Sequence, residues 1–170
     1  MVIIFSGRKN EKEKEIIEIL TKHGGDYISD KEVYSSSGKF TVISEYKKAE
    51  INIKKGIAII IDESDRFSDL NLGNGIIGIC ESTNKSALCV FEKNKIPIIS
   101  CGNNPKNTIT FSSLNDDNIL LSLQRTVRGI NSAKTEPCEL NIKLSKKYQP
   151  FSVMASATVL LLFGIEPREF

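Results

Sequence analysis

The segment 76–102, which reads IIGICESTNKSALCVFEKNKIPIISCG, constrains the fold more than any other part of the chain. An apolar run ends in a polar corner, an amphipathic stretch follows, and a second apolar run stops at Cys101 and Gly102. This pattern is typical of a strand, a helix and a second strand parallel to the first, joined by a right-handed crossover. It predicts an α/β protein.

Two further apolar runs fit the same sheet. Residues 2–5 stop at Ser6 and Gly7, and residues 57–61 run into acidic residues. Runs that are apolar on both faces are typical of parallel strands buried within a sheet. We therefore expect four runs to lie side by side in a mostly parallel sheet, namely 2–5, 57–61, 76–79 and 96–99.

Capping residues mark the helices between these strands. Asn10 is a favourable N-cap for a helix over 10–22, and Gly24 with Gly25 can supply its left-handed stop. The helix inside the segment 76–102 is expected to begin at a cap formed by Ser82 or Thr83.

The remaining elements predict an extension of the sheet. Residues 39–46 alternate between apolar and polar side chains, which indicates an edge strand. The runs 108–114, 119–127 and 138–144 follow one another without a helix, so we expect antiparallel strands beside or added to the parallel sheet. Residues 150–163 are apolar on nearly every face and should form a helix between layers.

The predicted fold class is α/β, with a mostly parallel, Rossmann-like sheet, flanking helices and an antiparallel extension in the C-terminal half. A chain of 170 residues is most simply a single domain, here residues 1–170.

Composition argues against several functions. The net charge is +2, and the basic residues are scattered rather than clustered with aromatic ones, so nucleic-acid binding is not expected. The four cysteines show no C-x-x-C spacing and the chain has one histidine, so we expect no metal site and no cofactor. The cysteines are interpreted as small buried hydrophobic residues.

The apolar stretches do not resemble targeting or membrane segments. The N-terminal MVIIFSGRKN lacks the order of a signal peptide, and the apolar stretch 153–163 is far shorter than the roughly 20 residues that span a bilayer. We expect a soluble, cytoplasmic protein without membrane contact.

A candidate ligand site follows from the strand order, because parallel strands end at the same edge of a sheet and ligands bind there. Glycines at this edge would let a ligand approach the backbone closely. Positive side chains and amides would provide hydrogen bonds to a small polar or anionic metabolite. The candidate ligand-binding residues are Gly7, Arg8, Lys9, Asp62, Gly102, Asn103 and Asn104. The alternative is that these are ordinary surface loops and that the protein binds a protein partner through its outer faces.

A small enzyme is a second alternative, with Cys101 or Cys80 as nucleophile, or with the acidic group Asp62, Glu63 and Asp65 at the same edge. A nucleophilic cysteine needs a base or a positive environment. His23 stands at the far end of the first helix, on the opposite side of the sheet, which argues against a Cys-His enzyme. A homodimer formed through strand edges is a further candidate assembly.

The order of elements from Ile76 onward resembles the ATP-binding central domain of the Mur ligases. The correspondence comprises strand, helix, the IPIISCG strand, antiparallel strands, and the small-residue helix MASATVLLLFGI. The N-terminal VIIFSGRKNEKEKEIIEIL is similar to that family's strand, phosphate loop and helix, in which the loop reads T-G-T-N-G-K-T. The resemblance implies an α/β fold with a nucleotide crevice.

The same resemblance implies that ATP chemistry is lost. In SGRKNEK only Ser6 and Gly7 match the family's loop, while Asn10 stands for the second glycine, Glu11 for the lysine and Lys12 for the metal-binding hydroxyl. A carboxylate is then expected where the triphosphate would lie. The corner that contacts the nucleotide in the family reads here CEST, residues 80–83. The family also continues into a further domain beyond the point that corresponds to Phe170. We therefore expect a noncatalytic, Mur-ligase-like protein with no catalytic residues.

Overall fold

One large sheet organises the structure, a computed structural model that describes residues 1–7, 10–45, 47, 50–115 and 117–170. Within these residues, ten strands form this sheet in the order β14-β11-β10-β9-β8-β6-β1-β4-β2-β3. Its strands are β1 (Val2–Phe5), β2 (Gly25–Ile28), β3 (Val33–Tyr34), β4 (Phe40–Glu45), β6 (Gly56–Ile60), β8 (Ile76–Glu81), β9 (Ile98–Cys101), β10 (Ile109–Leu114), β11 (Asn118–Leu123) and β14 (Cys138–Lys143).

The other elements flank this sheet. Two pairs of very short strands lie outside it, β5 (Glu50–Ile51) with β7 (Asn71–Leu72), and β12 (Val127–Arg128) with β13 (Lys134–Thr135). The helices are α1 (Glu11–Lys22), α2 (Lys85–Lys93), α3 (Pro150–Leu162) and the 3-10 turn η1 (Asp65–Phe67).

The parallel core of the sheet confirms the prediction from the apolar runs. β9, β8, β6 and β1 are neighbours in that order and are all parallel. β9 begins at Ile98, two residues after the start of the predicted run. Pro97 has no N–H to donate to the ladder, which explains the later start.

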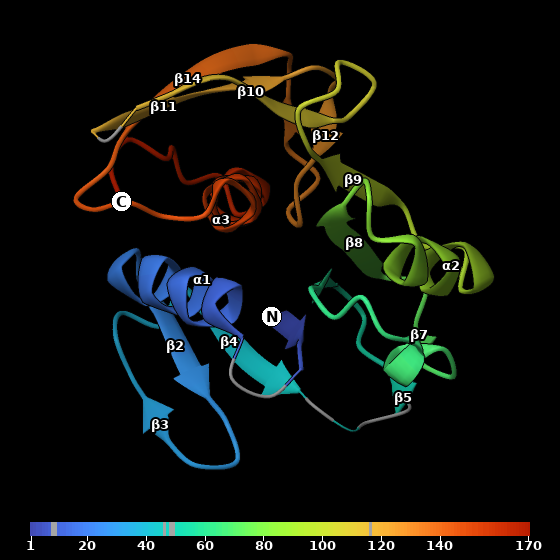
Figure 1. Ribbon diagram of the computed structural model, residues 1–170. Coiled ribbons are helices and arrows are strands. Elements are labelled where there is room, and N and C mark those ends of the chain that lie inside the picture. Colours follow the sequence, from blue (N-terminus) through green and yellow to red (C-terminus); the bar gives the residue numbers. More distant parts are fainter. Residues whose placement is uncertain (8–9, 46, 48–49, 116) are drawn as a thin grey trace.

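The antiparallel extension is also present. β10 joins β9 in parallel through Ile109 and Cys101, and β11 and β14 then add in antiparallel fashion. Figure 1 shows that these strands curl over α3, so the sheet wraps around this helix.

The prediction of an edge strand over residues 39–46 is wrong. β4 lies inside the sheet between β1 and β2, the edge is formed by β3, and Tyr46 lies outside the described residues. The predicted alternation is nevertheless present, since Phe40, Val42 and Ser44 are buried. Alternation reports which face of a strand is buried, but it does not report which strands lie beside it.

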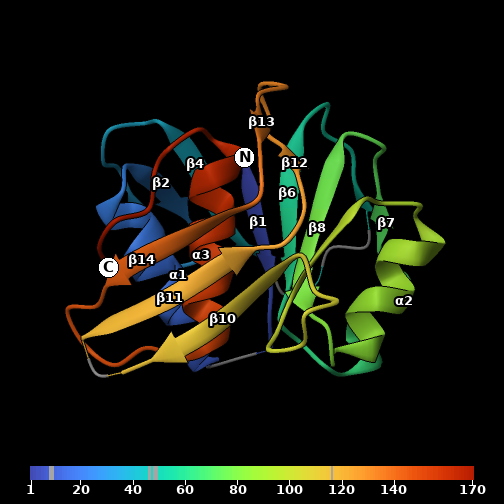
Figure 2. The ribbon, with the colours of Figure 1, turned by 90° about the horizontal axis from the view of Figure 1, so that it is seen from above.

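Helices cover the two faces unequally. α1 and α3 pack on one face, and α2 with η1 packs on the other. Figure 2 shows α1 and α3 on one side of β1, β6 and β8, and α2 on the other side. α3 is buried around nearly its whole circumference, as its apolar sequence predicts. In the part of the chain that the structure describes, no helix is both long and apolar enough to cross a membrane.

The ends of α1 follow from local chemistry. The side chain of Asn10 accepts a hydrogen bond from the backbone N–H of Lys12 at 2.9 Å, which confirms the predicted N-cap. Gly24 follows the helix with φ of +99°, a conformation that glycine adopts without strain. Gly25 is already the first residue of β2.

Candidate functional site

A cavity of about 260 Å³ opens where β1 and β6 end and where α1 and α3 begin. It is lined by Gly7, Asn10, Lys12, Ile61, Asp62, Glu63 and Gln149. Gly7 and Asp62, two of the predicted ligand-binding residues, therefore share one crevice. Arg8 and Lys9 lie outside the described residues.

Gly7 and Asp62 are in close contact within this crevice. A Cβ at residue 7 would lie 3.3 Å from Oδ2 of Asp62, so glycine lets the two loops approach. The Asp62 carboxylate accepts a hydrogen bond from the backbone N–H of Ser64 at 2.7 Å and lies 3.6 Å from Nε of Arg66. The first acidic side chain after β6 is thus fixed against its own loop.

The other acidic residues of this loop point to different partners. Asp65 accepts a hydrogen bond from Oγ of Ser86 in α2, at 3.1 Å, while Glu63 lines the cavity. Among the described residues, no group of three or more His, Cys, Asp or Glu side chains is placed to hold a metal ion.

Asn84 holds the acidic loop in place, a role that its sequence context does not reveal. The N-cap of α2 is this residue rather than Ser82 or Thr83, because its Oδ1 accepts from the backbone N–H of Ala87 at 2.9 Å. Its Nδ2 donates to the backbone carbonyl of Asp62 at 3.1 Å. Asn is as good a cap as Ser or Thr, so three adjacent candidates could not be separated by sequence.

Lys12 lines the crevice and forms an ion pair with a residue outside its lining. Its Nζ lies 2.6 Å from Oε2 of Glu81 at the end of β8, and 5.4 Å from the centre of the Phe151 ring in α3. The pair joins residues that are 69 positions apart, so no local pattern could have predicted it.

Glu11 does not occupy the crevice, contrary to the expectation that its carboxylate lies where a triphosphate would bind. It pairs with Lys14 at 3.1 Å on the exposed side of α1, and both side chains are more than half exposed. The first turn of a helix spreads its side chains around the axis, so Lys12 and Glu11 face different surroundings.

The loop after β9 does not line the cavity. Gly102 packs against Ser82 and Asn107, and a Cβ there would lie 2.6 Å from Nδ2 of Asn107. Asn103 and Asn104 are exposed, and Asn104 bonds within its own loop to the backbone N–H of Lys106. The structure thus separates these three predicted residues from Gly7 and Asp62.

The cysteines at the strand ends are buried thiols. Cys80 and Cys101 are fully buried, and burial raises the pKa of Cys80 to about 12 and raises the pKa of Cys101 well above its ordinary value. Both therefore stay protonated at neutral pH, which disfavours the nucleophile hypothesis. His23 bonds through Nδ1 to the carbonyl of Ile19 and packs against Phe170, so it gives the thiols no base.

Comparisons with known proteins support the fold. No protein-family model matches the sequence, and no curated protein matches it. Among solved structures, the chain is similar to the crystal structure of UDP-N-acetylmuramate:L-alanyl-gamma-D-glutamyl-meso-diaminopimelate ligase from Neisseria meningitides, with a TM-score of 0.59 and 10% sequence identity. The match covers 99% of this chain and 62% of that chain, so this chain spans less than two thirds of the ligase's length. At this identity the likeness shows the fold alone, which is α/β and Mur-ligase-like.

Proposed function

We propose that this protein binds a small, polar, anionic molecule in the crevice between β1, β6, α1 and α3, and that it does so without catalysis. The observation that supports the proposal is that the N-caps of two long helices, Asn10 of α1 and Gln149 of α3, line one cavity. Each helix N-terminus carries a partial positive charge and backbone N–H groups that favour an anion.

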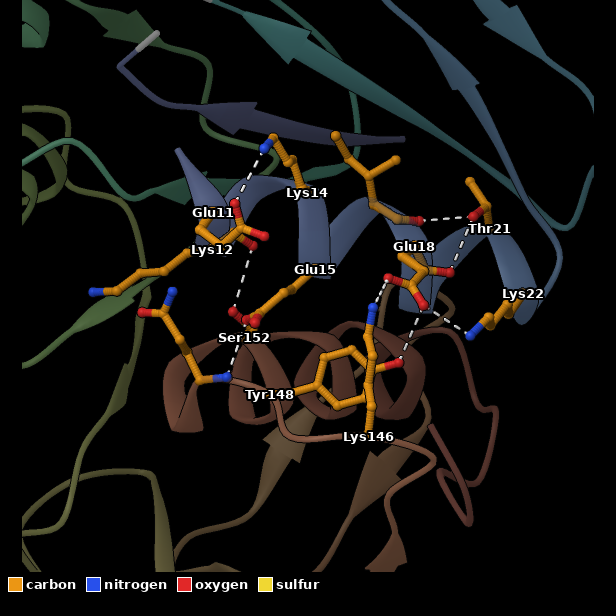
Figure 3. Close-up of polar contacts among 12 residues, drawn as sticks. Glu11, Lys12, Lys14, Glu15, Glu18, Thr21, Lys22, Lys146, Tyr148 and Ser152 are labelled. Atoms are coloured by element: carbon orange, nitrogen blue, oxygen red, sulfur yellow. Dashed lines mark hydrogen bonds and ion pairs between the residues drawn. The ribbon is translucent and has the colours of Figure 1, made fainter. Parts of the chain in front are cut away.

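The start of α3 is well positioned for such a contact. The backbone N–H of Gln149 donates to Oε2 of Glu15 in α1 at 3.0 Å. Figure 3 shows further contacts between α1 and the segment that leads into α3, made by Lys146 and Tyr148 with Glu18. The side chain of Gln149 makes no capping hydrogen bond. Its side-chain amide can therefore form hydrogen bonds with a ligand without giving up a contact that stabilises α3.

The residues in the first turn of α1 argue against ATP chemistry. The resemblance implies a lysine and a metal-binding hydroxyl at the positions of Glu11 and Lys12. In this protein Glu11 faces solvent with Lys14, and Lys12 contacts Glu81. The ammonium group of Lys12 cannot bind Mg²⁺ as the hydroxyl of a phosphate loop does. The carboxylate of Glu11 lies on the exposed side of α1.

The acidic residues refine the expected ligand. Asp62 and Glu63 also line the cavity, and carboxylates accept hydrogen bonds from hydroxyl and ammonium groups. We therefore expect a ligand that carries an anionic group together with such donors, as amino acids and sugar phosphates do.

A thermal-shift screen of nucleotides, UDP-sugars, sugar phosphates and amino acids tests the proposal, because a ligand of the native state raises the melting temperature. Binding of a hit should weaken strongly in Lys12→Gln, which changes the cavity, and should be unchanged in Asn103→Ala, an exposed residue outside it. A hit that binds Lys12→Gln as tightly as the parent would place the site elsewhere.

A protein partner is the second candidate, and the edge strand β3 favours it. Val33 and Tyr34 are 76% and 53% exposed, and Ile28 beside them is also exposed. An exposed apolar edge strand can pair with a strand of another chain, which includes a second copy of this one. Light scattering of the parent and of Val33→Lys tests whether this edge mediates association.

A further inference from the structure

β14 is the last strand at one end of the large sheet, and part of its outer edge is open. Figure 2 shows it beyond β10 and β11, with β11 along one side. On the other side, Lys143 at its end exchanges backbone hydrogen bonds with the C-terminal segment. Its N–H donates to the carbonyl of Arg168 at 3.0 Å, and its C=O accepts from the N–H of Phe170 at 2.8 Å. The residues of β14 before Lys143 make no such contact with the described part of the chain.

Strand geometry shows which backbone groups of β14 are free. In an antiparallel pair, successive residues direct their N–H and C=O groups alternately toward the neighbouring strand and away from it. Lys143 directs both groups away from β11, so Asn141 and Glu139 do the same. Pro137 ends this row because it has no N–H. The free edge therefore consists of the N–H and C=O groups of Glu139 and Asn141, and both side chains are exposed.

The side chains along this edge are arranged to suit a second copy of the same strand. Glu139, Asn141 and Lys143 share one face of β14. Within the residues that the structure describes, Glu139 and Lys143 have no ion-pair partner. Leu140 lies on the opposite face, where it packs against the core but is only half-buried. An edge that carries an acid, an apolar residue and a base in this order complements its own reverse.

We propose that two copies of this chain associate through this edge, with their β14 strands antiparallel across a two-fold axis at Leu140. A single antiparallel register uses every free group, and it places Glu139 of each copy opposite Asn141 of the other. The two Leu140 side chains then meet on the axis. Lys143 of each copy lies diagonally opposite Glu139 of the other, a separation that long side chains bridge. The right-handed twist of the strands favours this diagonal over the one between the two Glu139 residues.

The limits of the free edge favour a second copy over an unrelated peptide. In the proposed register, the residue opposite Lys143 is Pro137 of the second copy, which precedes the start of its β14. The second strand therefore ends before it reaches the C-terminal segment that occupies Lys143. A longer peptide strand would collide with this segment unless it turned at the same point. Pairing over so few residues should give a dimer that dissociates readily.

Analytical ultracentrifugation of the parent over a range of concentrations provides the first test, and it should show a monomer–dimer equilibrium. Asn141→Pro removes an N–H that points away from β11, so the sheet should keep its own hydrogen bonds. The dissociation constant should rise about tenfold or more, because the dimer loses one hydrogen bond for each copy. Val33→Lys, on the exposed edge strand β3, is the control and should leave the dissociation constant unchanged.

Charge reversal tests the contact between copies without altering the backbone. Glu139→Lys and Lys143→Glu should each raise the dissociation constant about fivefold, because each places like charges diagonally across the interface. The double variant Glu139→Lys/Lys143→Glu restores opposite charges and should return close to the parent. A loss of stability within one chain would not be reversed in this way, so this measurement decides the question even if Asn141→Pro folds poorly.

A cysteine on the axis tests the register itself. In the proposed dimer the two Cα atoms at residue 140 face each other at about 4.5 Å, a distance that a disulfide bridges. Leu140→Cys in a Cys138→Ser background should therefore form a disulfide-linked dimer on mild oxidation. The parent is the control and should remain unlinked. Its Cys138 is exposed on the same face, but it lies opposite Ile142 of the second copy, about 13 Å along the strand from its counterpart.

Each result supports or refutes the β14 dimer. A parent that stays monomeric at millimolar concentration refutes it, as does a Leu140→Cys variant that forms no more linked dimer than the parent. Association that survives Asn141→Pro but is lost in Val33→Lys belongs to β3 and refutes it too. The crevice takes no part in any of these measurements, so this inference goes beyond the proposed function and holds or fails independently of it.

Discussion

Gly78 in β8 lies directly under the ring of Phe91 in α2, so that a Cβ at residue 78 would come within 2.8 Å of three ring carbons. Real Cβ atoms do not approach carbon this closely. Phe91 belongs to the core on the α2 side of the sheet, its ring is fully buried, and Gly78 is buried beneath it. The glycine therefore sets how near α2 can pack to the centre of the sheet.

Gly78→Ala should destabilise the protein by about 1–3 kcal/mol, because overpacking a dense core forces neighbouring atoms apart. Phe91→Leu in the same chain should recover part of this loss by removing the atoms that clash. Urea unfolding of both single variants and the double variant gives the coupling free energy. Gly73→Ala, where a Cβ meets nothing closer than 3.4 Å, is the control, and an equal loss there would contradict the steric explanation.

Asn84→Leu should cost about 2 kcal/mol of stability, because it removes the N-cap of α2 and leaves the backbone groups that Asn84 pairs without partners. Because the same side chain holds the backbone of Asp62, the variant should also weaken any ligand found for the crevice. Asn84→Ser, which can still cap, should keep much of the stability but lose the contact to Asp62. Chemical denaturation and binding measured on both variants check this prediction.

Low pH should weaken the contacts between α1 and the segment that precedes α3. Glu18 accepts hydrogen bonds from Lys146 at 2.6 Å, Lys22 at 2.9 Å and Tyr148 at 3.3 Å, and these contacts are drawn in Figure 3. The Lys146 contact, followed by that of Lys22, lowers the pKa of Glu18 from 4.5 to about 2. Its stabilising contribution is therefore complete above the unfolded pKa and is lost as the pH falls toward the folded one.

Between about pH 5 and about pH 2, the free energy of unfolding should fall by about 1 kcal/mol more in the parent than in Glu18→Gln, a value reduced for the partial exposure of Glu18. Urea unfolding at several pH values measures this difference. Glu11→Gln, in an exposed pair with Lys14, serves as the control. Parallel pH curves for the parent and Glu18→Gln would contradict the assigned pKa.

The protein should neither hydrolyse Mg-ATP nor bind it tightly. The first turn of α1 offers Glu11 and Lys12 where a phosphate loop places a lysine and a hydroxyl, and Lys12 contacts Glu81. Phosphate-release assays and calorimetry check the prediction. A micromolar affinity for Mg-ATP, roughly −8 kcal/mol, would show that the altered loop still serves a nucleotide.

Local patterns predicted the parts of the fold that depend on neighbouring residues. The four parallel strands follow from short apolar runs, and the start of α1 follows from Asn10, because burial and capping are decided within a few residues. The position of β4 inside the sheet could not be predicted, since strand order depends on pairing between distant segments.

In the candidate site, too, features set by neighbouring residues could be predicted and contacts between distant segments could not. Gly7 and Asp62 line one cavity because both come shortly after apolar strands that are neighbours in the sheet. Gly102 follows such a strand too, but its loop turns toward Ser82 and Asn107. The Lys12–Glu81 pair depends on how two loops from different parts of the chain meet, and the sequence has no signal for it.

The wrapping of the sheet around α3 has a consequence for how the chain folds. This helix ends at Leu162, yet it packs against α1, β8, β9 and β10, and Tyr148 just before it reaches Glu18 over a separation of 130 residues. Contacts between such distant segments carry a large loop-closure entropy and slow folding. During synthesis, the apolar faces of α1 and of the curled strands stay exposed to solvent until α3 has left the ribosome. In this interval the nascent chain is most prone to aggregate and to bind chaperones.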